Sequence, residues 1–299
     1  MNDNMNYYEL EPEDNHFHDV IIDVTHRCNM MCKNCYKERM LDAISRFPTR
    51  TSIRIIGAEP TMRNDLPEIC QRIKDMGHRQ ILLTNGLRLA RKGYAEKLKA
   101  HGCNHMYLSL NGVDRDDWYL AIDEMECATK KLLALDAIIA NKILLQTGTI
   151  VVKGLNEEAP GRLLNLLKAK GVVNAIVRIK NVGQLGRYMN DAEGNVKLED
   201  LMQLCVDQMG VSWDYLQYWR NKPIIDTLDV EPDSFMFPLD PNAEGKPLNR
   251  SGIWIKIANW DTDNLEQIPS PNSFRRGRLT PDFRVAPFFE HVKLNEGGY

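Results

Sequence analysis

Short apolar runs and amphipathic segments alternate along the chain from residue 19 to about residue 182. The apolar runs, which are typical of buried strands, lie at 19–24, 51–56, 80–83, 105–110, 143–152 and 173–179. Between them, apolar residues recur at helical spacing, and single long helices are expected over 87–101 and 116–140. Strands separated by such helices pair in parallel, because the chain must return across the sheet before each new strand. The pattern therefore predicts an α/β fold of six strand–helix units.

This alternation stops after residue 182. Helices are expected at 196–209 and 213–220, a strand at 253–257, and a terminal hairpin around 284–286. We expect three parts: a lead-in at 1–18, the α/β unit at 19–182, and an α+β extension at 183–299 that covers the open side of that unit.

Composition limits the classes of function. The net charge of −3 gives no basic field that would indicate nucleic acid binding. No apolar run reaches the roughly 20 residues that a membrane helix needs, and the polar, acidic start at 1–13 is neither a signal nor a transit peptide. Seven cysteines suit a reducing compartment, so a cytoplasmic protein is expected, without a nucleic acid or membrane partner.

Three of the seven cysteines, Cys28, Cys32 and Cys35, follow the first expected strand with the spacing C-x3-C-x2-C. Three thiolates can bind three irons of a [4Fe–4S] cluster and leave the fourth iron open to another ligand. A zinc site usually shows a second pair of Cys or His ligands, and His26 is the nearby candidate. The spacing favours a cluster over zinc or buried thiols.

This cysteine run resembles the signature of the radical S-adenosylmethionine (radical SAM) superfamily, and the resemblance covers about 19–182. It implies a partial (β/α)6 TIM-like barrel with a C-terminal α+β extension over the barrel mouth. It also implies two cofactors, a [4Fe–4S] cluster and S-adenosylmethionine. Members often carry an aromatic residue before the third cysteine; here Asn34 stands there and Tyr36 follows the cysteine, so Tyr36 is the candidate contact to the cofactor.

The resemblance further implies an enzyme with a biosynthetic role. Its cluster, reduced by a flavodoxin or ferredoxin, would cleave S-adenosylmethionine to a 5′-deoxyadenosyl radical that abstracts hydrogen from the substrate. No run of cysteines follows Cys205, unlike the extensions that hold additional clusters in many peptide-modifying relatives. A small metabolite is therefore favoured. A peptide-modifying radical SAM enzyme is the alternative, and a non-enzymatic metal-binding module is the alternative from another class.

The end of the second expected strand carries Gly57, Ala58, Glu59 and Pro60. This turn resembles the superfamily's Gly-Gly-Glu-Pro motif, which holds the amino group of S-adenosylmethionine, with Ala58 in place of the second glycine. Small residues let the backbone approach a ligand, and a carboxylate suits an ammonium group.

Further candidates for contacts to S-adenosylmethionine lie at the ends of later strands, where barrels of this kind carry their chemistry. Two have structural alternatives, because Asn-Gly is also a common turn pair and an arginine within a strand also suits a structural ion pair. The candidates are Asn85, Ser109, Asn111, Thr149 and Arg178.

An arginine cluster in the extension, Arg275, Arg276 and Arg278 around Gly277, is the candidate substrate site. Planar guanidinium groups can bind a phosphate or carboxylate, and the chain as a whole is acidic. We expect this segment to fold over the barrel mouth and hold an anionic substrate. A solvated surface loop is the alternative.

Overall fold

The computed structural model describes residues 8–24, 36–182, 194–222, 234–242, 252–259 and 276–287. Its described strands form one ten-stranded sheet in the order β10-β9-β1-β2-β3-β4-β5-β6-β8-β7. The six central strands pair in parallel in chain order, which confirms the strand–helix alternation that the sequence predicts. They are β1 (Asp19–Asp23), β2 (Ser52–Ile56), β3 (Arg79–Thr84), β4 (His105–Ser109), β5 (Leu144–Ile150) and β6 (Asn174–Lys180).

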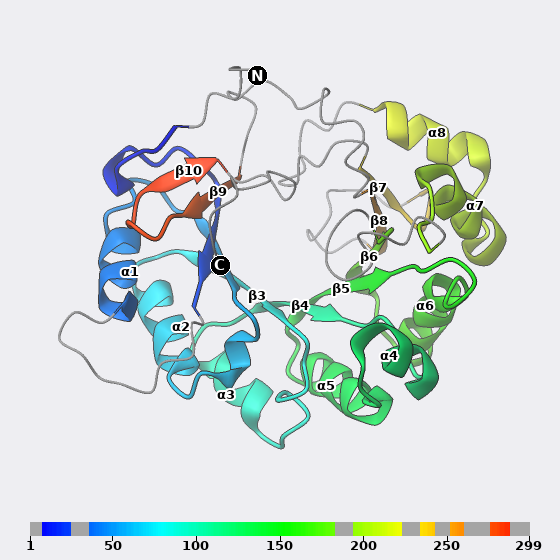
Figure 1. Ribbon diagram of the computed structural model, residues 1–299, viewed down its shortest axis with the longest axis horizontal. Coiled ribbons are helices and arrows are strands. Elements are labelled where there is room, and N and C mark those ends of the chain that lie inside the picture. The colour runs from blue at the N-terminus through cyan, green and yellow to red at the C-terminus, as the bar shows by residue number, and fades with distance from the viewer. Residues whose placement is uncertain are drawn as a thin grey trace.

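Helices follow these strands and lie along the convex side of the curved sheet (Figure 1). They are α1 (Tyr36–Ser45), α2 (Leu66–Asp75), α3 (Tyr94–Ala100), α4 (Asp116–Asp123), α5 (Ala128–Ala140) and α6 (Ala159–Ala169). Short 3-10 turns, η1 (Pro12–Asp14) and η2 (Pro60–Met62), precede β1 and α2. This arrangement is the partial TIM-like barrel that the resemblance implies.

Two of the expected helices are shorter than the sequence pattern predicts. The helix expected over 116–140 is broken, because Glu124 adopts the left-handed conformation with φ 56° and ends α4. The next helix, α5, restarts at Ala128, whose N–H donates to the Asp116 carboxylate at 2.7 Å. The helix expected over 87–101 begins only at Tyr94, after a left-handed Gly93 with φ 79°.

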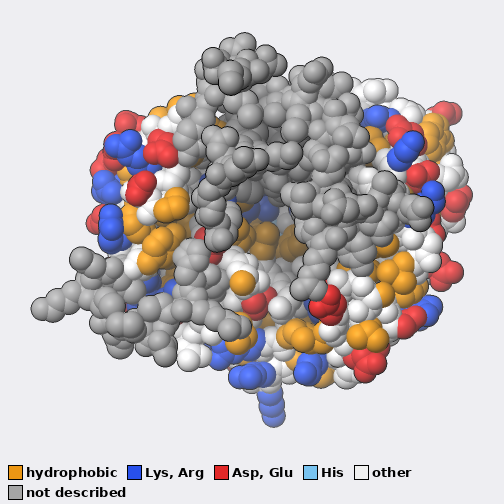
Figure 2. All heavy atoms as spheres, in the orientation of Figure 1, with side chains coloured by type: hydrophobic (Ala, Val, Ile, Leu, Met, Phe, Trp, Pro, Cys, Tyr) orange, Lys and Arg blue, Asp and Glu red, His pale blue; other side chains and the backbone are white. Residues whose placement is uncertain are grey.

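The hydrophobic core lies between the sheet and these helices. Val20 and Ile22 of β1 belong to it, together with Leu41 of α1 and Ile69 of α2. Strand side chains alternate between the two faces of a sheet, so the intervening residues of β1 point to the concave, inner face. Charged side chains of both signs are mixed along the outer rim of the molecule (Figure 2).

The segment after residue 182 lengthens the sheet at both edges. On one side β8 (Gly252–Ala258) pairs in parallel with β6, and β7 (Phe235–Pro238) pairs antiparallel with β8. On the other side β9 (Arg276–Leu279) pairs in parallel with β1, and β10 (Val285–Pro287) completes the expected hairpin. Two more helices, α7 (Leu198–Met209) and α8 (Trp213–Asn221), pack beside β8 and β7. The described parts of this segment therefore belong to the same sheet as the barrel.

No helix among the described residues is both long and apolar enough to cross a membrane.

Candidate active site

The carboxyl ends of the parallel strands meet at one edge of the sheet, and the expected cofactor residues belong to this edge. Cys28, Cys32 and Cys35 lie outside the described residues, as does Arg275. The residues on either side of the cysteine run are described: Val24 follows β1, and Tyr36 is the first residue of α1. The backbone N–H of Val24 continues the β1–β2 ladder by donating to Ile56 O at 3.0 Å.

The Tyr36 ring packs against the β9–β10 turn, with its centroid 5.1 Å from that of Phe283. The guanidinium of Arg39 also contacts Phe283, 4.3 Å from the ring centroid. Burial raises the pKa of Tyr36, and the nearby Asp23 carboxylate raises it further, while Arg278 opposes the shift. Tyr36 is therefore a neutral phenol between α1 and the C-terminal hairpin.

The Glu59 carboxylate connects the end of β2 to the end of β3. Its Oε1 accepts hydrogen bonds from Thr61 N at 3.0 Å, from Thr84 Oγ1 at 2.6 Å and from the Thr61 hydroxyl. Its Oε2 accepts from Asn85 N at 2.7 Å. Gly57, with φ 146°, supplies the backbone conformation that starts this turn, and Pro60 opens η2. The carboxylate is thus held in one orientation before any ligand binds.

The Thr-Asn-Gly sequence after β3 is a turn and also positions Glu59. The Asn85 side chain accepts from Leu87 N at 3.0 Å, and Gly86 N donates to Thr84 Oγ1 at 2.9 Å. A Cβ on Gly86 would overlap the Leu108 side chain, and φ is 80°. Only glycine fits both constraints. The structure therefore shows the turn, and contact of Asn85 with the cofactor stays a prediction.

The side chains of Asn111 and Thr149 are engaged in joining β4 to β5. Asn111 Nδ2 donates to Asp123 Oδ1 at 2.8 Å, and its Oδ1 accepts from Ile150 N at 3.0 Å. Thr149 Oγ1 donates to Leu110 O at 3.0 Å, and its side chain is fully buried. These contacts give both residues a structural role at the edge where cofactor contacts were expected.

Ser109, at the end of β4, has its carbonyl oxygen bonded to Lys131 Nζ at 2.9 Å. Lys131 lies in α5 with only 2% of its surface exposed, and burial lowers its pKa. Its ammonium group also lies 5.4 Å from the ring centre of Tyr119. No sequence pattern indicated Lys131, because a lysine in an amphipathic helix is ordinarily placed on the solvated face.

The inner face of the sheet is rich in basic side chains. Arg178 of β6 lies opposite Lys256 of β8 in the strand register, and both are buried. Lys256 was not predicted as a site residue, although the alternation within 253–257 places its side chain on the face opposite Ile253, Ile255 and Ile257. Beside Arg178, Gly148 has no side chain, and a Cβ there would overlap the Tyr107 hydroxyl. Tyr107 therefore extends over β5 toward Arg178.

The arginine cluster of the extension is divided by the strand that contains it. Arg276 is buried at the amino end of β9, where its Nε lies 3.4 Å from Asp19 Oδ2. The same carboxylate oxygen accepts a hydrogen bond from Arg54 Nε at 2.5 Å. Arg278 lies further along β9, opposite Ile21. The expected covering loop is thus, at 276–279, a strand, and the Asp19 contact places Arg276 at the end of β1 opposite to the barrel mouth.

The other cysteines do not form a second metal site among the described residues. They are all buried and free, and no group of three His, Cys, Asp or Glu residues there is suited to a metal ion. They are Cys70, Cys103, Cys127 and Cys205.

Comparison with known families shows that this chain matches a family model. The model described as the radical SAM superfamily matches residues 37–167. The "7,8-dihydro-6-hydroxymethylpterin dimethyltransferase" of Methanocaldococcus jannaschii is 27% identical over 214 residues, which cover 62% of this chain and 41% of that protein. The "Probable GTP 3′,8-cyclase" of Methanococcus aeolicus is 29% identical over 243 residues, 73% of this chain and 76% of that protein.

Other relatives are matched over only part of their length: the match covers 59% of the "Probable GTP 3′,8-cyclase" of Methanocella arvoryzae. Among solved structures, Streptococcus suis SuiB bound to S-adenosylmethionine superposes with a TM-score of 0.55 at 12% sequence identity. That superposition covers 94% of this chain and 60% of the SuiB chain. At this identity the likeness shows a shared fold.

Proposed function

This chain belongs to the radical SAM superfamily, and from that premise we propose that it acts on a small anionic metabolite. It is an enzyme whose cofactors are a [4Fe–4S] cluster and S-adenosylmethionine, and these supply the radical chemistry when bound. We assign the cluster to Cys28, Cys32 and Cys35, because three thiolates at this spacing leave one iron open. The electron donor would be a flavodoxin or ferredoxin in the cytoplasm.

The residues of this chain would bind and orient the cofactor at the strand ends. Glu59 offers a carboxylate held by donors from η2 and β3, and such a group suits the ammonium of S-adenosylmethionine. Gly57 and Ala58 leave the backbone open to close approach. Tyr36, Asn85 and Ser109 stay as proposed neighbours of the cofactor. For Asn111 and Thr149 we propose only support of this edge, since their side chains are bonded within the fold.

The charge of the inner sheet face is the observation that carries the substrate class. The chain has a net charge of −3, yet basic residues outnumber carboxylates at the inner-facing strand positions. The carboxylates there are Asp19 and Asp23. The basic residues are Arg54, Arg79, Arg178, Lys180, Lys256, Arg276 and Arg278.

Arg178 and Lys256 are buried on this face, and buried basic groups suit a phosphate or carboxylate ligand. The Methanococcus aeolicus relative is named for GTP, a polyanion, which agrees with this class. We propose Arg178, Lys256 and Arg278 as anion contacts, with Arg178 serving either the substrate or the cofactor carboxylate. The barrel unit at 19–182 would supply the cofactor site, and 183–299 would add the remaining wall and cover the mouth.

Anaerobic reconstitution followed by iron, sulfide and 5′-deoxyadenosine analysis tests this function. The wild-type chain should bind about four irons and four sulfides, the content of one [4Fe–4S] unit. Alanine at Cys28, Cys32 or Cys35 should abolish both the cluster and 5′-deoxyadenosine formation. Full iron content in a triple alanine variant would refute the cluster assignment, and about twice the iron would indicate a second cluster and favour the peptide-modifying alternative.

The substrate class has its own test. Binding of nucleoside triphosphates, sugar phosphates and carboxylic acids is measured by calorimetry against the uncharged parent compounds. The anionic members should bind and the uncharged parents should not. Binding of uncharged peptides, with none of the anions bound, would overturn the proposal.

A further inference from the structure

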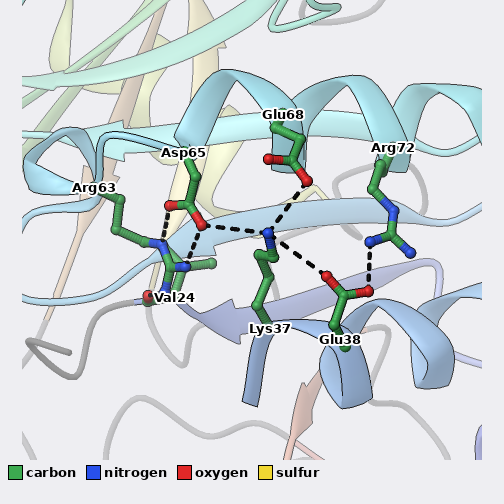
Figure 3. A network of polar contacts seen from close by, with 7 residues as sticks. All are labelled: Val24, Lys37, Glu38, Arg63, Asp65, Glu68 and Arg72. Atoms are coloured by element: carbon green, nitrogen blue, oxygen red, sulfur yellow. Dashed lines mark hydrogen bonds and ion pairs between the residues drawn. The ribbon is translucent and has the colours of Figure 1, made fainter. Parts of the chain in front are cut away.

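Two described residues, Val24 and Lys37, lie on either side of the segment that carries the three cysteines. The carbonyl oxygen of Val24 accepts a hydrogen bond from Arg63 Nη1 at 2.7 Å. Lys37, in the first turn of α1, has its Nζ 3.6 Å from Asp65 Oδ2. Both therefore contact the short loop that connects η2 to α2 (Figure 3).

Asp65 connects these two contacts. Arg63 donates through Nε to Asp65 Oδ1 at 2.8 Å and through Nη2 to Oδ2 at 2.7 Å, a bidentate pair with fixed geometry. The same Oδ2 faces Lys37. Hydrogen bonding from Arg63, together with the charges of Arg63 and Lys37, lowers the pKa of Asp65. A continuous path thus runs from Val24 through Arg63 and Asp65 to Lys37.

The rest of the network extends away from Val24. Lys37 Nζ lies 3.2 Å from Glu68 Oε1 and 3.6 Å from Glu38 Oε1. Glu38 in turn pairs with Arg72 at 2.7 Å. Three cations alternate with three carboxylates, so the network is neutral as a whole (Figure 3). Arg72 belongs to this network at its far end, where its contact is Glu38.

We propose that Asp65 is a positioning residue for the cysteine segment: through Arg63 and Lys37 it holds the two ends of that segment at a fixed separation. Fixing both ends of a loop reduces the conformational entropy that is lost when its thiolates converge on one cluster. The proposal rests on the assignment of the cluster to Cys28, Cys32 and Cys35. It predicts that Asp65 governs how firmly the cluster is retained, although Asp65 is not a ligand.

The test compares Asp65→Asn with Arg72→Gln in the reconstituted full chain under anaerobic conditions. Iron release to EDTA is followed by the loss of cluster absorbance, and the reduced cluster is examined by electron paramagnetic resonance. Asp65→Asn should release iron about tenfold faster, the lower end of the effect of outer-shell partners on metal binding, and should broaden the resonance. Arg72→Gln should match the wild type in both measurements. Asp65→Glu, which keeps the charge, should restore part of the retention.

Release from Asp65→Asn at the wild-type rate would overturn the proposal, and so would equal acceleration in Arg72→Gln, since the effect would then belong to the network in general. If Asp65→Asn does not fold, Lys37→Gln replaces it, because it removes the contact at one end only and must also speed iron release. A wild-type chain that never takes up iron would instead refute the cluster assignment, so the two failures are distinguishable.

Discussion

The backbone N–H of Asn85 donates to Oε2 of Glu59 at 2.7 Å, so a carboxylate from the end of β2 is held by the end of β3. Oε1 of the same carboxylate already accepts from Thr61 and Thr84. The turn after β3 therefore orients the side chain that the turn after β2 supplies. A preoriented carboxylate loses little conformational entropy when a ligand binds.

The first prediction concerns this carboxylate. Glu59→Gln should weaken S-adenosylmethionine binding by about 1.5–3 kcal/mol, the range for a hydrogen bond to a charged group. The charge is lost, and the amide NH2 must also face one of the present donors. Anaerobic calorimetry with the reconstituted protein measures the effect. Thr61→Val is the matched control: it removes one hydroxyl donor and keeps the charge, so binding should stay near that of the wild type. Unchanged affinity in Glu59→Gln would contradict the assignment.

The second prediction separates two arginines of β9. Arg276 lies beside Asp19 and Arg54 at the amino end of the strand, so Arg276→Gln should lower stability and leave substrate affinity unchanged in the folded fraction. Arg278 lies further along β9, opposite Ile21 on the inner face, where we propose an anion contact, so Arg278→Gln should weaken anion binding. The loss should be about 1.5–3 kcal/mol if the bond is charge-assisted.

Thermal unfolding and anion titration of both variants measure these effects. The same loss of anion affinity in Arg276→Gln as in Arg278→Gln would refute the division of roles.

The third prediction is a loss of stability in mild acid. Burial, assisted by the charge of Arg54, lowers the pKa of His105 to about 3. Near pH 6.5 the His105 side chain of the unfolded chain takes up a proton, while that of the folded chain stays neutral. The stability that neutral His105 contributes is therefore fully present above that pH and is lost as the pH falls toward about 3. His78 acts in the same direction, because burial lowers its pKa as well.

Urea unfolding of the metal-free protein and of a His105→Phe variant isolates the contribution of His105. The free energy of unfolding of the wild type should fall relative to the variant by about 1.4 kcal/mol between pH 7.5 and pH 5.5. Parallel pH profiles of the two proteins would show that the folded and unfolded chains bind this proton over the same pH range, which would contradict the lowered pKa of His105.

The sequence pattern predicted the parts of the fold that depend on local signals. Apolar runs marked the six barrel strands, and the alternation within 253–257 marked β8. The break at Glu124 was not predicted, because a left-handed residue other than glycine has no strong signature in residue type. The break at Gly93 was also missed, although a glycine inside a helical pattern is a signal that the helix starts or ends there. The pairing of β9 with β1 was not predicted either, since it joins distant parts of the chain.

The candidate site divides in the same way. Glu59 was predicted from a motif, and the structure adds the donors that orient it. Lys131 and Tyr107 could not be found from sequence, because their burial depends on elements that pack against them. For Asn111 the residue type was consistent with ligand binding, but its amide is bonded at both ends within the fold. Short-range sequence patterns indicate which residues reach the strand ends. Packing decides which of their side chains are hydrogen-bonded within the fold.

The pairing of β1 with β9 has a consequence for synthesis on the ribosome. The first strand of the sheet acquires its outer neighbour only after residues 276–279 have emerged, so the nascent chain carries an open strand edge for most of translation. Such an edge can pair with other chains, and folding intermediates with unpaired strand edges are prone to aggregate. The charged pair of Asp19 and Arg54 lies at the start of this edge, where charges disfavour wrong pairing, and Arg276 joins it only when β9 is in place.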